Sequence, residues 1–273
     1  MKLEHLIKQP FTDTLKKAAD RACKLCLYIW NRFVLRVTID RPPTFIVGCG
    51  HSGTSVLLRI LGAHPNIYPI PYESNIAIKK DELTFLKAVN KFDRMSISAG
   101  KRRWVEKTPK HILHIDDILK WLPQAKIILI IRDGRDVAYS IKARTGDLES
   151  GIKRWHEHNL AAHKHWDNPN VYVIKYEKLI SDFEHSITDL TSFLGETYKS
   201  GMKEYYKNKK KWYSKVISKP PTAFGKNHGQ YRNWQINQPL FDGRGRWKDL
   251  SAEELSCIKE VAGSMLTEFG YTK

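Results

Sequence analysis

Apolar residues follow two patterns along the chain, which together predict strands alternating with helices. Short β-branched runs lie at 45–47, 126–131 and 171–176, and stretches with apolar residues every three or four positions follow at 54–61, 112–122 and after Ser251. The run at 126–131 has no polar interruption, which is typical of a central parallel strand covered on both faces. We therefore predict a three-layer α/β sandwich with a mostly parallel central sheet, and ligands at the carboxyl ends of its strands.

A separate pattern precedes the first strand. Residues 12–37 form a predicted basic amphipathic helix, and Arg41-Pro42-Pro43 ends it, so we expect an extension over 1–40 and one larger domain over 41–273. The predicted apolar stripe either packs on the larger domain, which we favour, or rests on a membrane surface. It comprises Leu15, Ala19, Ala22, Cys26, Ile29, Phe33 and Val37.

The net charge of +17, from 46 basic and 29 acidic residues, predicts attraction to polyanions without naming one. The densest basic region is 199–226, where lysines alternate with aromatic residues. It could bind nucleic acid or a sugar-rich anionic acceptor, or be a solvated helix face followed by a loop, and we favour the last. Residues 220–237 are expected to be irregular and to act as a lid. The aromatic residues among the lysines of 199–226 are Tyr205, Tyr206, Trp212 and Tyr213.

Cysteine content and hydropathy favour a cytoplasmic location, with peripheral membrane contact through the first helix as an addition. Four cysteines in 273 residues do not predict a disulfide framework, and the pair Cys23 and Cys26 is expected to be half-buried helical thiols. The sequence contains no stretch of about 20 apolar residues, so no membrane span is predicted.

The stretch that follows the first predicted strand has the composition of a phosphate-binding loop. Gly48 and Gly53 have the spacing of the nucleotide triphosphate loop, but Thr54 stands where that motif has its lysine. Without this cation, a ligand with a single 5′-phosphate group is favoured over a triphosphate with magnesium. A glycine-rich turn without a ligand, and a kinase or nucleotide hydrolase, stay open on this stretch alone.

A second stretch favours one family. Arg132-Asp-x-Arg-Asp-Val-x-x-Ser140 follows the run at 126–131, and together with the glycine loop it resembles the sulfotransferases that use 3′-phosphoadenosine-5′-phosphosulfate (PAPS). Further similar segments are Trp104–Pro109, 171–177 and the Gly-Arg-Trp at 245–247. The match is closer to the carbohydrate and tyrosylprotein members than to the phenol and steroid members.

The resemblance implies the residues that contact the donor. The first loop would hold the 5′-phosphosulfate, Arg132 and Ser140 the 3′-phosphate, and Tyr176 the adenine region. The segment 245–247 would close on the 3′-phosphate. By this resemblance the donor-binding residues are Gly50, His51, Ser52, Gly53, Thr54, Ser55, Arg132, Ser140, Tyr176, Gly245, Arg246 and Trp247.

The resemblance also implies the chemistry. Glu73 is expected to take the proton of the acceptor hydroxyl, and Lys107 and His51 to support the leaving phosphate, without a metal. His51 departs from the family, which has Lys or Arg there, because a histidine is only partly charged near neutrality. Val56 departs as well, since the small-molecule members have a tryptophan at this position.

Other histidines offer alternatives that we rank lower. His111 and His114 could replace Glu73 as the base, but are expected to be surface residues at a helix start. A cluster at His156, His158, His163 and His165 is expected to be a solvated helix face, with a metal site as its alternative, because residues two apart on a helix point in different directions.

We therefore expect an enzyme that moves a sulfuryl group from PAPS to a hydroxyl group, on a saccharide or a glycolipid. Protein tyrosine is the alternative acceptor. A non-catalytic polyanion or nucleic-acid binder, or a nucleotide kinase, is the alternative of another class. The oligomeric state does not follow from the sequence.

Overall fold

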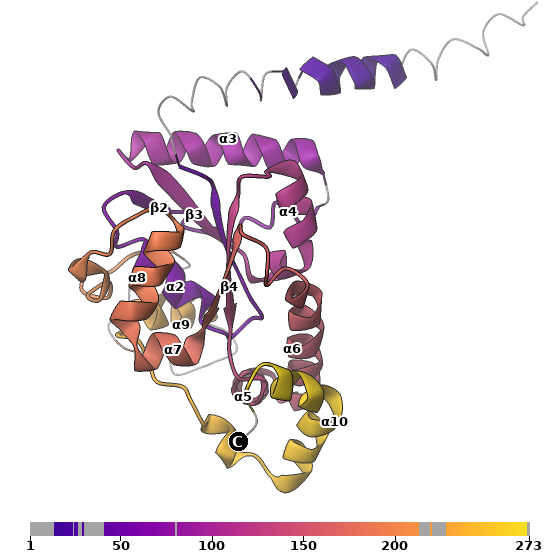
Figure 1. Cartoon of the computed structure of the whole chain (residues 1–273), viewed down its shortest axis with the longest axis vertical. Coiled ribbons are helices and arrows are strands. Elements are labelled where there is room, and N and C mark those ends of the chain that lie inside the picture. The colour runs from indigo at the N-terminus through magenta and orange to yellow at the C-terminus, as the bar shows by residue number, and fades with distance from the viewer. Residues whose placement is uncertain are drawn as a thin grey trace, which may run out of the picture.

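The structure, a computed structural model, describes residues 14–23, 25, 26, 29, 41–79, 81–212, 219 and 228–271. Its centre is a five-stranded sheet in the order β2-β3-β1-β4-β5, and all four pairings are parallel (Figure 1). This confirms the predicted fold class. The strands are β1 (Thr44–Val47), β2 (Ile67–Pro69), β3 (Arg103–Lys107), β4 (Lys126–Ile131) and β5 (Val171–Lys175).

Helices follow or precede every strand, and several begin with a side-chain cap. Asp81, Asp133 and Asp147 each accept a hydrogen bond from a backbone N–H of the first turn that they precede, and Ser251 forms the capping box expected of the last helix. The helices are α2 (Thr54–Leu61), α3 (Glu82–Ser98), α4 (Ile115–Trp121), α5 (Gly134–Thr145), α6 (Leu148–His163), α7 (Tyr176–Ser181), α8 (Phe183–Phe193), α9 (His228–Gln235) and α10 (Ala252–Glu268), with 3₁₀ turns at Pro109–His114, Ser200–Met202 and Arg246–Asp249.

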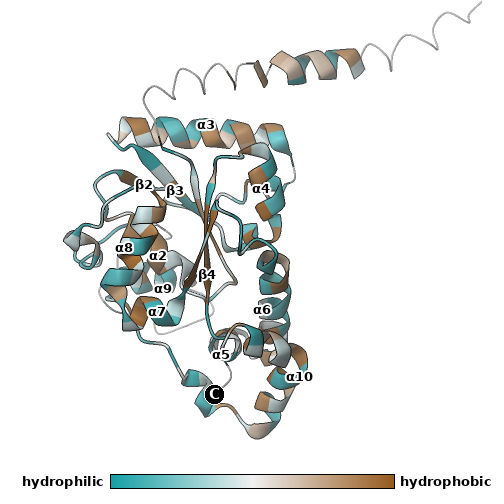
Figure 2. Ribbon diagram, viewed as in Figure 1, coloured by the Kyte–Doolittle hydropathy of each residue, from teal (hydrophilic) through white to brown (hydrophobic). Residues whose placement is uncertain are grey.

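The two faces of the sheet bury separate apolar cores. Phe45 and Ile127 lie in the core beneath α3, α4, α5, α6 and α10, whereas Ile46 and Ile128 lie in the core beneath α2, α7 and α8. Successive residues of a strand point to opposite faces, so a strand that is buried on both sides must be apolar throughout. Figure 2 shows this in β4, which is hydrophobic along its length. The three-layer arrangement follows from it.

The parallel topology brings five chain segments to one end of the sheet. The glycine loop follows β1, the segment with Glu73 follows β2, Lys107 ends β3, Arg132 follows β4 and Tyr176 follows β5. All five carboxyl ends therefore meet at one edge, which is where ligands of such sheets bind.

Residues 14–23 are helical, as expected, but they do not pack on the larger domain with their apolar side. Every side chain described in 14–29 is exposed, including Leu15, Leu25 and Ile29. Cys23 and Cys26 are exposed rather than half buried. Figure 1 shows this helix beyond α3, which it meets through an ion pair of 3.7 Å between Arg21 and Glu82. Residues 25, 26 and 29 are helical as well, and the rest of the predicted helix 12–37 lies outside the described residues. No described helix is long and apolar enough to span a membrane.

The lysine-rich region differs from the expected helix face. In the described part, residues 203–212 are turns and irregular chain, and Tyr205 is buried. The guanidinium of Arg59 in α2 anchors this segment, because it donates hydrogen bonds of 2.7 Å to the carbonyl oxygens of Tyr205 and Asn208. Residues 220–237 were expected to be irregular, and this is wrong for 228–235, which form α9. The rest of the predicted lid lies outside the described residues.

Candidate active site

The loop between β1 and α2 has the backbone shape of an anion cradle. His51 and Gly53 both have positive φ, 73° and 99°, and α2 begins immediately afterwards at Thr54. A side chain at Gly53 would meet the ring of Tyr176 at 2.9 Å, so the loop packs directly against the end of β5. The loop thus presents the amino end of α2, with its unpaired N–H groups, towards the carboxyl edge of the sheet.

Two observations in this loop fit a bound phosphosulfate group. The Ser52 hydroxyl is buried and has no hydrogen-bond partner among the described residues. A Cβ built on Gly50 would have no neighbour within 4 Å, so space lies in front of the loop. A buried polar group without a partner is costly, and an anion at this place would satisfy it. The residues present therefore fit the 5′-phosphosulfate that the sequence predicts here.

Arg132 and Ser140 are brought to this loop from β4 and α5. The Nδ1 atom of His51 lies 2.8 Å from the Ser140 hydroxyl, and Arg132 donates a hydrogen bond of 3.2 Å to the carbonyl oxygen of His51. The Arg132 guanidinium also lies 4.5 Å from the centre of the Tyr176 ring. Four residues that the sequence assigns to the donor site are thus in mutual contact.

The segment 243–247 joins the same group. Arg132 donates a hydrogen bond to the carbonyl oxygen of Gly243. The carboxylate of Asp136 accepts the backbone N–H groups of Gly245 and Trp247, at 3.0 and 3.1 Å. The Arg246 guanidinium lies over the ring of Tyr139, the neighbour of Ser140. The predicted proximity of 245–247 to Arg132 is present, and the buried Asp136, which the sequence analysis missed, holds it there.

Glu73 and Lys107 form the second part of the site. The Lys107 ammonium is almost fully buried and lies 2.5 Å from the Glu73 carboxylate. The same Glu73 oxygen is 2.6 Å from Nη2 of Arg232 in α9, and this Nη2 also lies 3.3 Å from the hydroxyl of Ser55. Arg232 therefore links the predicted base to the phosphate-binding loop.

The charge of Glu73 follows from these neighbours. Burial by itself would raise the pKa of the Glu73 carboxyl, but the charges and hydrogen bonds of Lys107 and Arg232 outweigh it, and the pKa is lowered from its ordinary value. Glu73 is therefore ionised at neutral pH, which is the form a general base requires.

A buried network fixes the segment that carries Glu73. The Glu106 carboxylate accepts hydrogen bonds from the backbone and hydroxyl of Ser74, at 3.0 and 2.8 Å, and from the hydroxyl of Thr108 at 2.6 Å. His111 lies 3.2 Å from Glu106 and accepts the N–H of Ala77. His111 was expected at the surface, and this is wrong, because its side chain is completely buried. It supports the loop of Glu73 and has no access to an acceptor.

The other histidines that the sequence analysis singled out form no metal site among the described residues. His114 is a mostly buried residue, 3.4 Å from Asp117. His158 and His165 are buried rather than solvated, so the expected solvated helix face is wrong for these two. Among the described residues no three metal-ligating side chains converge.

Positive charges act on one another near the end of α5. The pKa of Arg144, in the last turn of α5, is lowered by burial and then by the positive charges of Arg154 in α6 and of Arg232, the α9 residue that contacts Glu73. The sequence analysis missed all three, since no motif marks them.

Aromatic side chains flank the same region. Tyr231 and Trp234 in α9 lie on either side of Arg232 in sequence, with ring centres 5.8 Å apart. Tyr72, next to Glu73, is partly exposed, and the Lys91 ammonium lies 5.5 Å from its ring. Aromatic side chains are thus sequence neighbours of both Glu73 and Arg232.

Comparison with known proteins points to the same family. The model of the sulfotransferase family matches residues 73–200, a little under half of the chain. Over this stretch the chain is similar to that family. This match includes Glu73, Lys107, Arg132, Ser140 and Tyr176, and the recognition made from the motifs is therefore confirmed.

Solved sulfotransferases have the same fold. The sulfotransferase domain of the Synechococcus PCC 7002 olefin synthase is 17% identical, with a TM-score of 0.58 over 81% of this chain and 94% of that domain. The mouse sulfotransferase SULT7A1, solved in complex with PAP, is 19% identical, with a TM-score of 0.56 over 83% of this chain and 85% of that one.

An uncharacterized protein of Aquifex aeolicus is 26% identical over 256 residues, which cover 72% of this chain. The match spans 34% of that relative, so the chain corresponds to about a third of its length.

Proposed function

We propose that this sulfotransferase moves the sulfuryl group of PAPS to a hydroxyl group of an anionic saccharide, either free or as part of a glycolipid. The observation that carries the proposal is the contact of Glu73 with Lys107 and Arg232, and of Arg232 with Ser55. An ionised carboxylate thus stands next to a loop that fits a phosphosulfate, and this is the arrangement that transfer to a hydroxyl needs.

PAPS supplies an activated sulfuryl group when bound. The Glu73 carboxylate accepts the proton of the acceptor hydroxyl while that oxygen bonds to sulfur and the bond from sulfur to the 5′-phosphate oxygen breaks. Lys107 and His51 stabilise the negative charge that collects on the leaving phosphate. The products are a sulfate monoester and adenosine 3′,5′-bisphosphate (PAP), and no metal takes part in this scheme.

The residues around Arg132 support the donor assignment independently of Glu73. Arg132, Ser140 and the segment 243–247 place a guanidinium, a hydroxyl and backbone groups next to the loop. This is the set expected for a 3′-phosphate, and the related mouse enzyme was solved with PAP. We propose that these residues form part of the donor site. We also propose that the protein is cytoplasmic.

The positive charges beside Arg232 favour an anionic acceptor. Arg154 and Arg232 lie close enough to Arg144 to lower its pKa, and bound carboxylate or sulfate groups would relieve this repulsion. The aromatic faces of Tyr231 and Trp234 could pack against sugar rings.

The test is transfer of labelled sulfate from PAPS to a panel of acceptors: a carboxylated polysaccharide, its carboxyl-reduced neutral form, a glycolipid and a tyrosine peptide. We expect label on the carboxylated polysaccharide or on the glycolipid, and little on the neutral form. The double variant Arg144→Gln and Arg154→Gln should raise KM for the anionic acceptor and leave that for the neutral form unchanged. Label on the tyrosine peptide alone would contradict the saccharide assignment, and no label on any acceptor would contradict transfer to these classes.

A further inference from the structure

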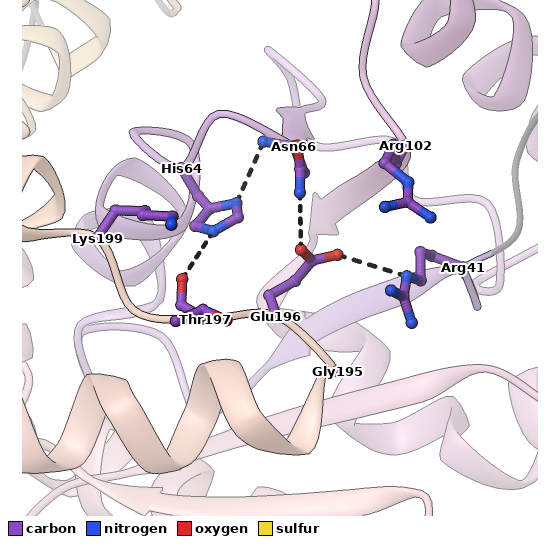
Figure 3. Close-up of a pocket in the computed structure, with 8 residues that line it drawn as sticks. All are labelled: Arg41, His64, Asn66, Arg102, Gly195, Glu196, Thr197 and Lys199. Carbon is purple, nitrogen blue, oxygen red and sulfur yellow. Dashed lines mark hydrogen bonds and ion pairs between the residues drawn. The ribbon is translucent and has the colours of Figure 1, made fainter.

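A second polar pocket lies at the opposite end of the sheet from the donor site. It has a volume of roughly 230 Å³ and is lined by eight residues from the segments that precede β1, β2 and β3 and that follow α8 (Figure 3). Its wall at His64 lies just beyond the last turn of α2, the helix whose first turn carries the phosphate-binding loop. The lining residues are Arg41, His64, Asn66, Arg102, Gly195, Glu196, Thr197 and Lys199.

We propose that this pocket binds a phosphate or sulfate group, either as a small free anion or monoester or as the headgroup of an anionic lipid. The inference does not depend on the reaction proposed above, because it rests on a different end of the molecule.

The composition of the lining excludes an apolar ligand. None of the eight residues has an aliphatic or aromatic hydrocarbon side chain. Sites for drug-sized molecules are mostly apolar and measure about 300–1,000 Å³. A polar pocket of about 230 Å³ is therefore suited to a small, strongly hydrated group, which must be held by charge and hydrogen bonds.

The charge of the lining is positive. Arg41, Arg102 and Lys199 carry three positive charges, and Glu196 carries the one negative charge of the lining. His64 adds none at neutral pH, because burial, partly offset by the Thr197 carbonyl and Glu196, lowers its pKa. Figure 3 shows Lys199 on one side of the pocket and the two guanidinium groups together on the other. An anion between these sides would be attracted by both.

The carboxylate of Glu196 does not cancel this charge. Its side chain is 4% exposed, and its Oε1 lies 3.8 Å from Arg41 and 3.9 Å from the buried Arg103, which stands behind the lining. Its Oε2 accepts a hydrogen bond of 2.9 Å from Asn66. Two guanidinium groups thus face one carboxylate, and Arg102 and Lys199 add two further positive charges to the lining.

The wall of the pocket is preformed. Nδ1 of His64 accepts the backbone N–H of Asn66 at 3.2 Å, and its Nε2 donates to the carbonyl oxygen of Thr197 at 3.0 Å. The carbonyl oxygen of Asn66 in turn accepts the backbone N–H groups of Arg102 and Arg103. These bonds join the segment 64–66 to the segments that carry Arg102 and Lys199, so little order has to be gained there on binding.

Guanidinium groups and an ammonium around a small polar space match a tetrahedral oxyanion better than a carboxylate. A phosphate or sulfate offers at least three oxygens to donors on different sides, and a guanidinium can bind two of them at once. The affinity should fall as salt is added, because Arg102 and Lys199 are exposed and their charges are screened.

The experiment is calorimetric titration of inorganic phosphate and of sulfate into the whole protein saturated with PAP, so that the donor site is already filled. The test variant is Arg102→Gln with Lys199→Gln. The matched control is Arg94→Gln with Lys259→Gln, which removes the same charges from exposed positions on α3 and α10. We expect one anion per chain, with affinity at least tenfold weaker in the test variant and unchanged in the control.

Two further arms separate the sources of the anion. Glucose 6-phosphate tests a soluble monoester, and vesicles of phosphatidylcholine with and without phosphatidic acid test a headgroup. Binding to the acidic vesicles that needs Arg102 and Lys199, with little binding of soluble anions, would assign the pocket to a lipid. Equal anion affinity in the two double variants, or no binding of phosphate, sulfate, monoester or acidic vesicles, would overturn the proposal.

Discussion

The two halves of the proposed active site are built in different ways. In the donor half, the phosphate-binding loop, Arg132, Ser140 and Tyr176 lie on or just beyond β1, β4 and β5, which are adjacent in the sheet. In the acceptor half, Glu73 follows the edge strand β2, and Arg232 comes from α9, 159 residues further along the chain. The donor half thus has its position fixed by the sheet, whereas the acceptor half depends on side-chain contacts between distant segments.

This difference predicts how each half responds to change. A donor-half residue should affect nucleotide affinity, because its partners are fixed by the backbone. An acceptor-half residue should affect the chemical step or its pH dependence, because Glu73, Lys107 and Arg232 set one another's charge. The variants of Glu73, Asp136 and Arg232 test the two halves separately by these measurements.

The largest effect is expected for Glu73→Gln. Loss of a general base typically costs about 10²–10⁴ in kcat, while the neutral amide keeps the size of the side chain. PAP affinity, measured by calorimetry, should change little, since Glu73 belongs to the acceptor half. Glu260→Gln, at an exposed position of α10, is the control and should keep full activity. A Glu73→Gln variant with more than a tenth of the original kcat would rule out this base.

Asp136→Asn tests the donor half. The Asp136 carboxylate accepts the backbone N–H groups of Gly245 and Trp247, and an amide can accept only with its oxygen, so the segment should loosen. We expect PAP affinity to fall about tenfold, as for the loss of one charge-assisted hydrogen bond of about 1.5 kcal/mol. Affinity for adenosine 5′-phosphate should stay unchanged. An equal loss for both nucleotides would mean that the segment does not act on the 3′-phosphate.

Arg232→Gln tests the acceptor half through pH. Without the guanidinium, the pKa of Glu73 should rise, because one of the two cations that lower it is gone. A base works only when deprotonated, so kcat/KM should begin to fall at a higher pH on the acid side in the variant than in the original protein. Profiles between about pH 5 and 8 measure this. Superimposable profiles for Arg232→Gln and the surface control Arg94→Gln would contradict the assigned role.

The smallest effect concerns the buried histidine of α6. Burial, with the charges of Arg154 and Lys110, lowers the pKa of His158 to about 4. In the unfolded chain the pKa of a histidine is about 6.5. Between this value and the folded pKa, His158 binds a proton only in the unfolded chain, so the free energy of unfolding rises with pH in this window and is lost as pH falls. Within the window, each pH unit changes the free energy of unfolding by up to about 1.4 kcal/mol, which corresponds to roughly 2–4 °C in Tm. His158→Gln should flatten this slope in thermal unfolding, and an unchanged slope would assign it to other groups.

The sequence predicts the donor half well because local pattern and topology agree there. A glycine loop after one apolar run and Arg132 with Ser140 after another must meet once the runs form adjacent parallel strands. The contact of Tyr176 with Arg132 is likewise present in the structure, and Asp136 in α5 holds Gly245 by a hydrogen bond. Their roles towards the nucleotide stay predictions, as do the domain limits.

The acceptor half is less predictable because its residues are brought together by tertiary packing. Arg232 lies in an eight-residue helix with only Tyr231, Trp234 and polar neighbours, where the Pro-Pro before it suggested an irregular lid. His111 looked like a surface residue because a histidine near a helix start usually is one, but Glu106 lies opposite it on the buried strand β3. No local pattern marks a pairing between residues so placed.

The most direct test of the account is calorimetric titration of PAP into the purified protein, compared with adenosine 5′-phosphate, ATP and the Arg132→Ala variant. We predict micromolar binding of PAP, weaker binding of the two nucleotides that lack the 3′-phosphate, and loss of this preference in Arg132→Ala, whose guanidinium lies 3.2 Å from the carbonyl oxygen of His51 in the loop. Equal affinity for PAP and ATP, or full PAP affinity without Arg132, would contradict the donor site and with it the proposed sulfuryl transfer.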